Sequence, residues 1–261
     1  MAHSPVTVPV RDTTLRLWRG GAGAALLFLH DATGAAGWPP VFEMLAKRFD
    51  VLAPEHPGYG GEEPPAWLDR VADLSNFYLD MLDALDLEQL HLVGASLGGW
   101  IAAELATRNT SRLASLTLID PLGLRVAGGI DPFATNDEQT IRDLFHDKAA
   151  ADAAVKRLLA PEAEDALLRN KMVTAKLAWQ PRLHDPHLAK WLHRIDVPTL
   201  ILWGEADRIL PKAALTQWER AIPESRGRVV PGAGHLPHLE NPDAVAGHII
   251  DFIAAHKKAA S

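Results

Sequence analysis

Ser96 lies in a pattern of residues that could make its hydroxyl a nucleophile. Residues 92–100 read LVGASLGGW, so that Gly94 and Gly98 flank Ser96 in a G-x-S-x-G motif. Apolar residues precede this motif and good helix formers follow it, which predicts a buried strand that turns sharply into a helix. In such a turn the serine backbone is strained and its hydroxyl stands clear of the sheet. The alternative is a serine in an ordinary strand-to-helix turn.

Two further residues could activate this serine, because a serine hydroxyl needs a base and the base needs an orienting acid. Asp207 follows the apolar stretch 197–203 (VPTLILW), and His235 ends the motif GAGH after the short stretch 228–230. Both follow predicted strands, at the carboxyl edge where the sites of α/β folds assemble. The chemistry that these three residue types predict is acyl transfer.

The elements that must position these residues follow from the hydrophobic periodicity. The segments expected as strands are 6–10, 15–18, 24–29, 50–53, 89–93, 113–119, 197–203 and 228–230. The segments expected as helices, besides the one after Ser96, are 41–48, 66–85, 137–145, 149–159, 163–177, 212–221 and 243–255. This alternation implies right-handed βαβ units, and so an α/β fold with a mostly parallel sheet and helices on both faces.

One long segment interrupts this alternation. Residues 121–195 contain no convincing strand but three helical patterns rich in alanine, leucine and charged residues. We therefore expect a core formed by residues 1–120 and 196–261, with a helical insertion at 121–195.

Together the three motifs resemble the α/β-hydrolase superfamily, in its serine-nucleophile branch with a helical cap. The resemblance runs from about residue 15 to the carboxyl terminus, and the superfamily's chain order of nucleophile, acid and histidine matches Ser96, Asp207 and His235. It implies that Ser96 is the nucleophile, that His235 is the general base and then the general acid, and that Asp207 fixes the imidazole tautomer. It also implies that the insertion is a cap domain over Ser96, and we expect no cofactor.

Other residues compete for two of these roles. Glu205 and His238 lie close in sequence to the acid and the histidine, but the superfamily's G-x-x-D and G-x-G-H motifs favour Asp207 and His235. Asp120, which ends the strand before the insertion, matches a position where some relatives carry the acid. The competing interpretation of Asp120 is a cap for the following turn.

An oxyanion needs fixed N–H donors, and we expect one from the backbone of Leu97. Residues 28–34 (FLHDATG) resemble the superfamily's His-Gly oxyanion loop, which implies the Ala32 amide as the second donor. Asp31 stands where the superfamily usually has glycine. Its carboxylate could repel an oxyanion or serve a specialised substrate, but we favour a side chain that bonds the amides of its own loop.

The substrate pocket is expected to be apolar, which suggests a small or medium, partly hydrophobic substrate. The residues considered for its lining are His30, Asp31, Phe133, Leu144, Phe145, Trp179 and Trp191. His56, in the motif EHPGYG, is interpreted as structural. His184 and His187 lack metal-ligand spacing and are interpreted as parts of a loop or helix cap, so no metal site is expected.

Composition excludes several classes of protein. The 261 residues are 48% hydrophobic and 23% charged, which is typical of a globular chain. The formal charge of −7 without a basic run argues against nucleic-acid or membrane partners, and the absence of cysteine removes disulfides and thiol chemistry. Because no signal segment opens the sequence and no apolar stretch is long enough to span a bilayer, we expect a cytoplasmic protein with a small-molecule substrate.

Three functions remain open. The first hypothesis is a serine carboxylesterase that works through an acyl-enzyme. The alternative enzyme, by resemblance, is a hydrolase of carbon–carbon bonds in vinylogous diketones, or an enol-lactonase, of aromatic-compound breakdown. The third is a ligand receptor on the same fold, whose triad turns over slowly or not at all.

Overall fold

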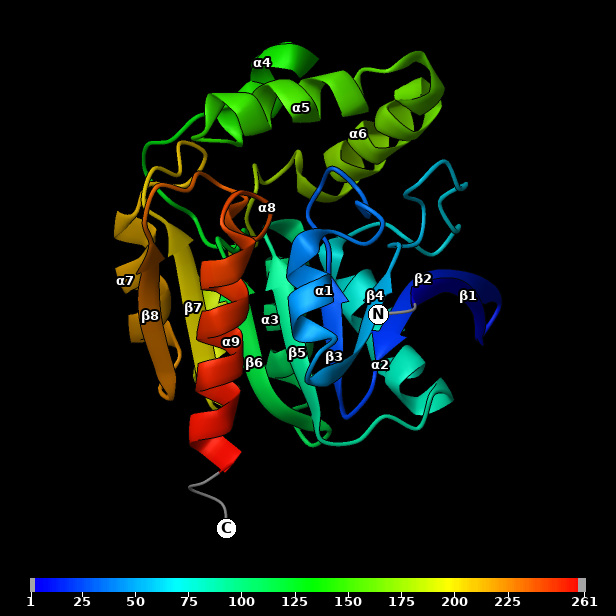
Figure 1. Cartoon of the computed structure of the whole chain (residues 1–261), viewed down its shortest axis with the longest axis vertical. Helices are drawn as coiled ribbons and strands as arrows, with labels where there is room; N and C mark the ends of the chain where they lie inside the picture. Colours follow the sequence, from blue (N-terminus) through cyan, green and yellow to red (C-terminus); the bar gives the residue numbers. More distant parts are fainter. Residues whose placement is uncertain (1–2, 258–261) are drawn as a thin grey trace.

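A single eight-stranded sheet forms the centre of the protein, as seen in a computed structural model that describes residues 3–257 (Figure 1). The strand order is β1-β2-β4-β3-β5-β6-β7-β8. The pairs β1–β2 and β2–β4 are antiparallel, and every other neighbouring pair is parallel. The predicted α/β fold with a mostly parallel sheet is therefore confirmed.

The strands and helices alternate along most of the chain. The strands are β1 (His3–Val10), β2 (Thr13–Gly21), β3 (Ala24–Leu29), β4 (Phe49–Pro54), β5 (Leu90–Ala95), β6 (Leu113–Ile119), β7 (Thr199–Gly204) and β8 (Ser225–Val230). The α-helices are α1 (Pro40–Leu45), α2 (Val71–Ala84), α3 (Leu97–Arg108), α4 (Asp137–Asp143), α5 (Lys148–Leu158), α6 (Glu164–Ala178), α7 (Ala213–Ala221), α8 (Pro237–Glu240) and α9 (Pro242–Lys257).

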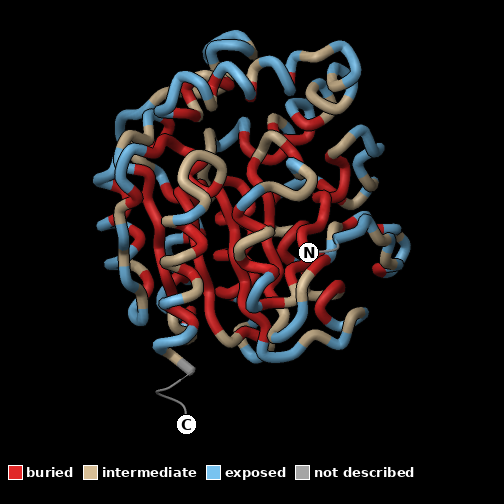
Figure 2. Tube along the Cα trace, viewed as in Figure 1, coloured by how far each residue is buried: buried red, intermediate tan, exposed pale blue. Residues whose placement is uncertain are grey.

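Helices cover both faces of the sheet because alternate strand residues are apolar on both sides. Leu26 and Phe28 of β3 pack in one cluster with residues of α1 and α9. Leu27 and Leu29 pack in the other cluster, with residues of α2, α3 and α7. The central strands are therefore buried along most of their length (Figure 2). Each large apolar side chain buried in this way stabilises the fold by roughly 1.5–3 kcal/mol.

The helices α4, α5 and α6 form a separate layer above the carboxyl edge of the sheet (Figure 1). They lie within residues 121–195, which we call the helical segment. The structure assigns no strand to this segment, only an isolated bridge between Gly123 and His184. The helical segment thus faces the edge of the sheet at which β5, β6 and β7 end and the loops after them begin.

Most predicted elements are found with ends shifted by no more than three residues, and two elements differ further from the sequence prediction. The helix expected at 66–85 begins at Val71, because the Asp73 carboxylate accepts hydrogen bonds from the N–H groups of Asp69 and Arg70 and so caps the helix there. The short helix α8 was not expected, since its four residues are too few to show a helical period.

Among residues 3–257, no helix combines the length and the apolar character needed to cross a membrane. Met1 and Ala2, which belong to the amino-terminal stretch considered above for a signal, lie outside the described residues.

Candidate active site

The nucleophile candidate lies in a strained turn between β5 and α3. Ser96 is buried and has a backbone φ of 52°, in the left-handed region that non-glycine residues rarely adopt. Its N–H donates to the carbonyl of Ile119 on β6, at 2.8 Å. Side chains at Gly94 and Gly98 would collide with the backbone of Gly98 and of Leu29, respectively. The two glycines of the motif are therefore required for this close approach, as the pattern predicted.

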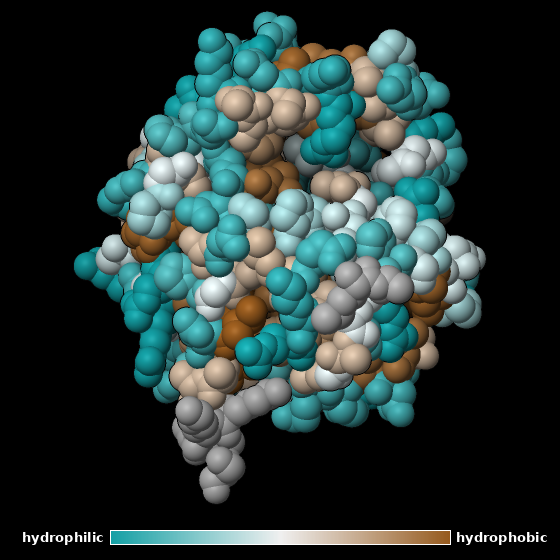
Figure 3. Space-filling view, in the orientation of Figure 1, coloured by the Kyte–Doolittle hydropathy of each residue, from teal (hydrophilic) through white to brown (hydrophobic). Residues whose placement is uncertain are grey.

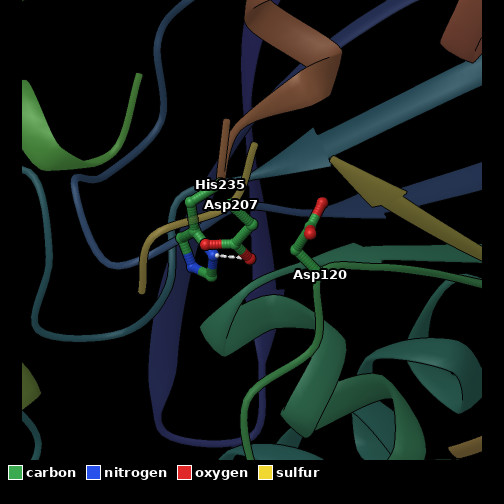
Figure 4. Close-up of side chains that lie close together, drawn as sticks. All are labelled: Asp120, Asp207 and His235. Carbon is green, nitrogen blue, oxygen red and sulfur yellow. Dashed lines mark hydrogen bonds and ion pairs between the residues drawn. The ribbon is translucent and has the colours of Figure 1, made fainter. Parts of the chain in front are cut away.

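The structure brings the three predicted residues of the triad together. His235 lies in the loop after β8 and Asp207 in the loop after β7 (Figure 4). The Nδ1 atom of His235 donates to Oδ2 of Asp207 at 2.8 Å, and the hydroxyl of Ser96 donates to Nε2 of His235 at 2.8 Å. With Nδ1 protonated, Nε2 is free to accept the serine proton.

Asp207 is held as a charged carboxylate. Its Oδ1 atom accepts hydrogen bonds from the backbone N–H groups of Ile209 and Leu210, at 2.8 and 3.0 Å. Burial alone would raise its pKa, but the charge and hydrogen bond of His235, together with hydrogen bonds from Asp120 and Leu210, outweigh burial and lower the pKa. Asp207 is therefore ionised at neutral pH and can stabilise an imidazolium.

The competing residues occupy other positions. The Glu205 carboxylate accepts from the N–H of Gly232 at the surface. His238 lies 3.7 Å from Asp31 rather than beside Ser96. Burial lowers the pKa of His238 to about 4, against the opposing effect of Asp31, so its imidazole is neutral at pH 7. Neither side chain forms part of the hydrogen-bonded chain that ends at Ser96.

Asp120 lies next to Asp207, on the side away from His235 (Figure 4). It is fully buried. Both of its carboxyl oxygens lie within hydrogen-bond distance of the N–H of Gly204, at 3.0 and 3.1 Å. Within residues 3–257, Asp120, Asp207 and His235 form the one cluster of His and carboxylate side chains close enough to hold a metal ion. In this cluster Nδ1 of His235 is engaged with Asp207, so we interpret the set as a hydrogen-bond chain.

The oxyanion loop after β3 is held by paired histidines. The Nε2 atom of His30 accepts from the N–H of His56, and Nε2 of His56 donates to the carbonyl of His30, both at 2.9 Å. Burial lowers the pKa of His56 well below its ordinary value, so His56 is neutral. The hydrogen bonds of His56 agree with the structural role that we predicted for it.

One carboxylate oxygen of Asp31 bonds an amide of its own loop, as we favoured from the sequence, although the residue also borders the cavity. Its Oδ1 atom accepts from the N–H of Thr33 at 2.8 Å, and its side chain is buried. Ala32 and Ser96 line the same cavity, whereas Leu97 follows Ser96 at the first position of α3. The two amides expected as oxyanion donors therefore belong to the loop and the helix end that flank the serine. Their role stays a prediction.

A cavity of about 400 Å³ separates Ser96 and His235 from the helical segment. Most of its walls are apolar, and hydrophobic side chains appear between the largely hydrophilic surfaces of the helical segment and the core (Figure 3). Of the residues predicted for the pocket, Asp31, Phe133, Leu144 and Trp179 line the cavity. A small, mainly apolar substrate fits such a space.

Three residues predicted for the pocket do not line this cavity. His30 is buried behind the loop, where its ring bonds to His56. Phe145 turns into a small core with Ile141 and Leu158. Trp191 lies between two 3-10 turns, half exposed to solvent, with its ring near His193. Aromatic type alone did not reveal which way each side chain turns.

Helix α6 supplies much of the cavity wall, and none of its residues was predicted for the pocket from the sequence. The contributing residues are Leu167, Leu168, Asn170, Lys171, Met172, Thr174 and Ala175. These residues lie on one side of the helix, so the helical period of the predicted segment 163–177 could have grouped them. Which of its faces turns toward Ser96 could not be read from that period.

Hydrogen bonds tie the helical segment to both sides of the site. Asn170 donates from Nδ2 to the carbonyl of Thr33 in the oxyanion loop at 2.8 Å, and its Oδ1 accepts from the N–H of Gly60 at 2.9 Å. On the other side, the N–H of His235 donates to the carbonyl of Leu144 at 2.9 Å. The position of the helical segment is therefore linked to the oxyanion loop and to the histidine loop.

The loop residues considered and dismissed as metal ligands are bonded locally. His184 donates from Nδ1 to the carbonyl of Arg182 at 2.8 Å, and Asp185 accepts from the N–H of His187 at 2.7 Å. The second bond caps the turn that follows, as the loop interpretation predicted.

A model of the alpha/beta hydrolase family matches residues 26–248. By sequence, the chain is 26% identical to a 2-hydroxy-6-oxononadienedioate/2-hydroxy-6-oxononatrienedioate hydrolase of Cupriavidus pinatubonensis, over 95% of this chain and 94% of that one. It is 28% identical to a 2-hydroxymuconate semialdehyde hydrolase of Pseudomonas sp. strain CF600, over 92% and 90%.

Among solved structures, a bacterial membrane phospholipase A resembles the chain with a TM-score of 0.85 and 25% identity, over 98% of this chain and 87% of that one. An enol-lactonase from Burkholderia xenovorans LB400 resembles it with a TM-score of 0.77 and 21% identity, over 95% and 100%. This second likeness concerns the fold.

Proposed function

Because this chain belongs to the alpha/beta hydrolase family, we propose that it is a hydrolase in which Ser96 attacks a carbonyl carbon of a small, mainly apolar substrate. One observation carries the proposal. The hydrogen-bonded chain of Ser96, His235 and Asp207 ends at an apolar cavity, in which a carbonyl compound can reach the serine hydroxyl.

The proposed reaction has two steps. His235 accepts the proton of Ser96 as its oxygen bonds to the carbonyl carbon, and the amides of Leu97 and Ala32 stabilise the resulting oxyanion. The imidazolium then gives its proton to the leaving group, which departs and leaves an acyl-Ser96. In the second step His235 activates a water molecule that releases the acid. We propose that the helical segment acts as the cap that shields these steps.

The relatives favour the carbon–carbon hydrolase alternative over the carboxylesterase that the sequence analysis placed first. The two relatives named above are hydrolases of a 2-hydroxy-6-oxo dienedioate and of 2-hydroxymuconate semialdehyde. Neither substrate name contains an ester, so its hydrolysis must break a carbon–carbon bond beside a carbonyl group. We therefore take cleavage of such a bond, in an unsaturated keto acid or a related enol-lactone, as the first candidate reaction.

Carboxylic ester hydrolysis is the second candidate, and the charges of the cavity favour it. A dienedioate carries two carboxylates, yet Asp31 and Asp137 both contribute to the cavity wall. Lys171 is the one lysine or arginine among the described residues of that wall, and it already pairs with Asp137. An uncharged acyl group is better matched to such a lining than a dianion is.

The two candidates separate in one experiment. We would measure kcat/KM for 2-hydroxy-6-oxo-6-phenylhexa-2,4-dienoate and for p-nitrophenyl esters from acetate to octanoate, each with wild type and Ser96→Ala. Serine-dependent turnover of the dienoate well above that of every ester supports carbon–carbon cleavage, and the reverse order supports the esterase. Tight binding of these compounds without multiple turnover would contradict both and favour the receptor.

A further inference from the structure

The backbone of Asp120 is strained and held by a hydrogen bond, like that of Ser96. Asp120 follows β6 with a backbone φ of 41°, again in the left-handed region. Its N–H donates to the carbonyl of Leu202 on β7 at 3.0 Å. The residue before it, Ile119, accepts the hydrogen bond from Ser96. The same strand end thus positions the nucleophile and the Asp120 carboxyl, although the proposed reaction assigns Asp120 no step.

The two neighbouring carboxyl groups are unequally supplied with donors. Asp207 accepts from the backbone N–H groups of Ile209 and Leu210 and from His235. Asp120 accepts from the single N–H of Gly204 and is fully buried. One carboxyl oxygen of Asp120 lies within 4.8 Å of one of Asp207, and both side chains are buried. Two negative charges at this distance would repel, which favours a proton on one of the two groups. The group with fewer donors retains that proton.

The electrostatic balance agrees with this assignment. Burial, the charge of Asp207 and the hydrogen bond to Asp207 together raise the pKa of Asp120 well above its ordinary value, and Glu240 adds to this effect. The pKa of Asp207 is lowered, as described above. Both directions favour a single negative charge on the pair at neutral pH, on Asp207.

We propose that Asp120 is a positioning residue: as a neutral carboxylic acid it donates its O–H to Asp207 and holds that carboxylate toward His235. The inference rests on the proposed role of Asp207 as the orienting acid. A donated hydrogen bond also reduces the basicity of Asp207, so that the Asp207 carboxylate stabilises the imidazolium of His235 less strongly. Asp120 thereby extends the three-residue chain to four residues.

The first test measures protonation without any need for turnover. In the unfolded chain an aspartate ionises near pH 4, so folding of the wild type above that pH takes up a proton onto Asp120. Wild type should therefore lose stability relative to Asp120→Asn as the pH rises. The ratio of the unfolding constant of wild type to that of the variant should grow about tenfold per pH unit. Urea unfolding at pH 5, 6 and 7 measures this ratio. A constant ratio would mean that Asp120 is ionised and would overturn the proposal.

Asp143→Asn is the matched control, since Asp143 is a buried carboxyl that pairs with a cation. Its Oδ1 lies 3.1 Å from the Arg208 guanidinium and accepts from Gln139 at 2.8 Å. Removing a paired charge should destabilise the protein and should produce no advantage that grows with pH. A growing advantage in this control would show that the effect at Asp120 is not specific, and would equally overturn the inference.

The second test asks whether protonated Asp120 affects the imidazole of His235 through Asp207. The charged or titratable groups around this imidazole are Asp207, Asp120, His238, Asp31 and Glu240. Asp120→Asn keeps a neutral donor for Asp207 and an acceptor for the N–H of Gly204. Its kcat/KM, and the acidic limb of the plot of kcat/KM against pH, should therefore match wild type. Asp120→Ala removes the donor, which should lower kcat/KM about tenfold and move the acidic limb to higher pH.

Three outcomes of this second test would contradict the role. An acidic limb at lower pH in Asp120→Asn would show that a negative charge was removed, and an unchanged limb in a folded Asp120→Ala would leave Asp120 a purely structural role. A loss of activity in Asp120→Asn equal to that in Asp120→Ala would show that a neutral donor is not sufficient. Failure of the proposed hydrolase is recognised separately, because the unfolding ratio does not depend on turnover.

Discussion

The triad and the cavity wall that faces it differ in the interactions that hold them in place. At the triad, Ser96, His235 and Asp207 hold one another by hydrogen bonds of fixed direction, and the side chains of all three are buried. The wall on α6 is only partly apolar and is not closed off from solvent, since Leu168 and Met172 are 55% and 64% exposed. Directional bonds fix the chemistry, whereas the wall sets which molecule fits and tolerates change more readily.

The two regions meet at few polar contacts. Asn170 connects α6 with Thr33 in the oxyanion loop, and Glu240 accepts from the N–H groups of Gly234, beside the histidine, and of His146, in the helical segment. A change at such a contact should affect the reaction rate, although neither side chain belongs to the triad. The comparison of triad and wall can therefore be tested by variants on each side and at the contacts between them.

The largest effect is expected at the nucleophile. Ser96→Ala should lower kcat/KM by about 10⁵-fold or more, because no other group can form the acyl-enzyme. Unfolding in urea should stay close to that of wild type, since the side chain loses only one oxygen. Turnover within tenfold of wild type, after exclusion of contaminating activity, would contradict the assignment of Ser96.

A smaller but still large effect is expected at the acid. Asp207→Asn should lower kcat by about 10³- to 10⁴-fold, because the amide cannot stabilise the imidazolium and favours the wrong tautomer. The lowered pKa of Asp207 means that its ionised form stabilises the fold above the unfolded pKa, and that this contribution is lost as pH falls. Urea unfolding between pH 7 and pH 3 should therefore show a smaller loss in the variant. An equal loss would show that Asp207 is not the stabilised carboxylate.

A moderate effect is expected at the contact between the regions. Asn170→Ala should lower kcat about tenfold, because the oxyanion loop loses the hydrogen bond that α6 donates to Thr33. Thr174→Val is the matched control on the same helix, since Thr174 bonds to the hydroxyl of Tyr59 and not to the oxyanion loop. Equal losses of kcat in both variants would indicate general loosening of α6 rather than a specific effect on the loop.

The smallest effect is expected at the cavity wall, where Trp179 can be compared with Trp191, a tryptophan of nearly equal exposure that lies outside the wall. Trp179 is 51% exposed and lines the cavity, while Trp191 is 52% exposed and lies outside it. Trp179→Ala should raise KM about fivefold for the longest substrate accepted and leave kcat for the shortest unchanged. Trp191→Ala should change neither. A response of KM to Trp191→Ala would show that the substrate reaches beyond this cavity.

Much of the site followed from short motifs because their geometry is local. Gly94 and Gly98 are needed within a few residues of Ser96, and Asp207 and His235 each follow a strand directly. A parallel sheet brings such strand ends to one edge, so spacing along the chain was enough to predict that the three side chains meet. Phe145 and Trp191 failed as pocket residues because their direction depends on packing with distant residues.

The sequence by itself determined the α/β alternation, the strained turn at Ser96 and the identity of the three triad residues, because each depends on periodicity or on residues close in the chain. Only the tertiary structure decided that Asp120 lies against Asp207, that Asn170 reaches Thr33 and that one face of α6 forms the cavity wall. These contacts join residues about 87, 137 and more than 70 positions apart, whose proximity depends on how whole elements pack rather than on any local pattern.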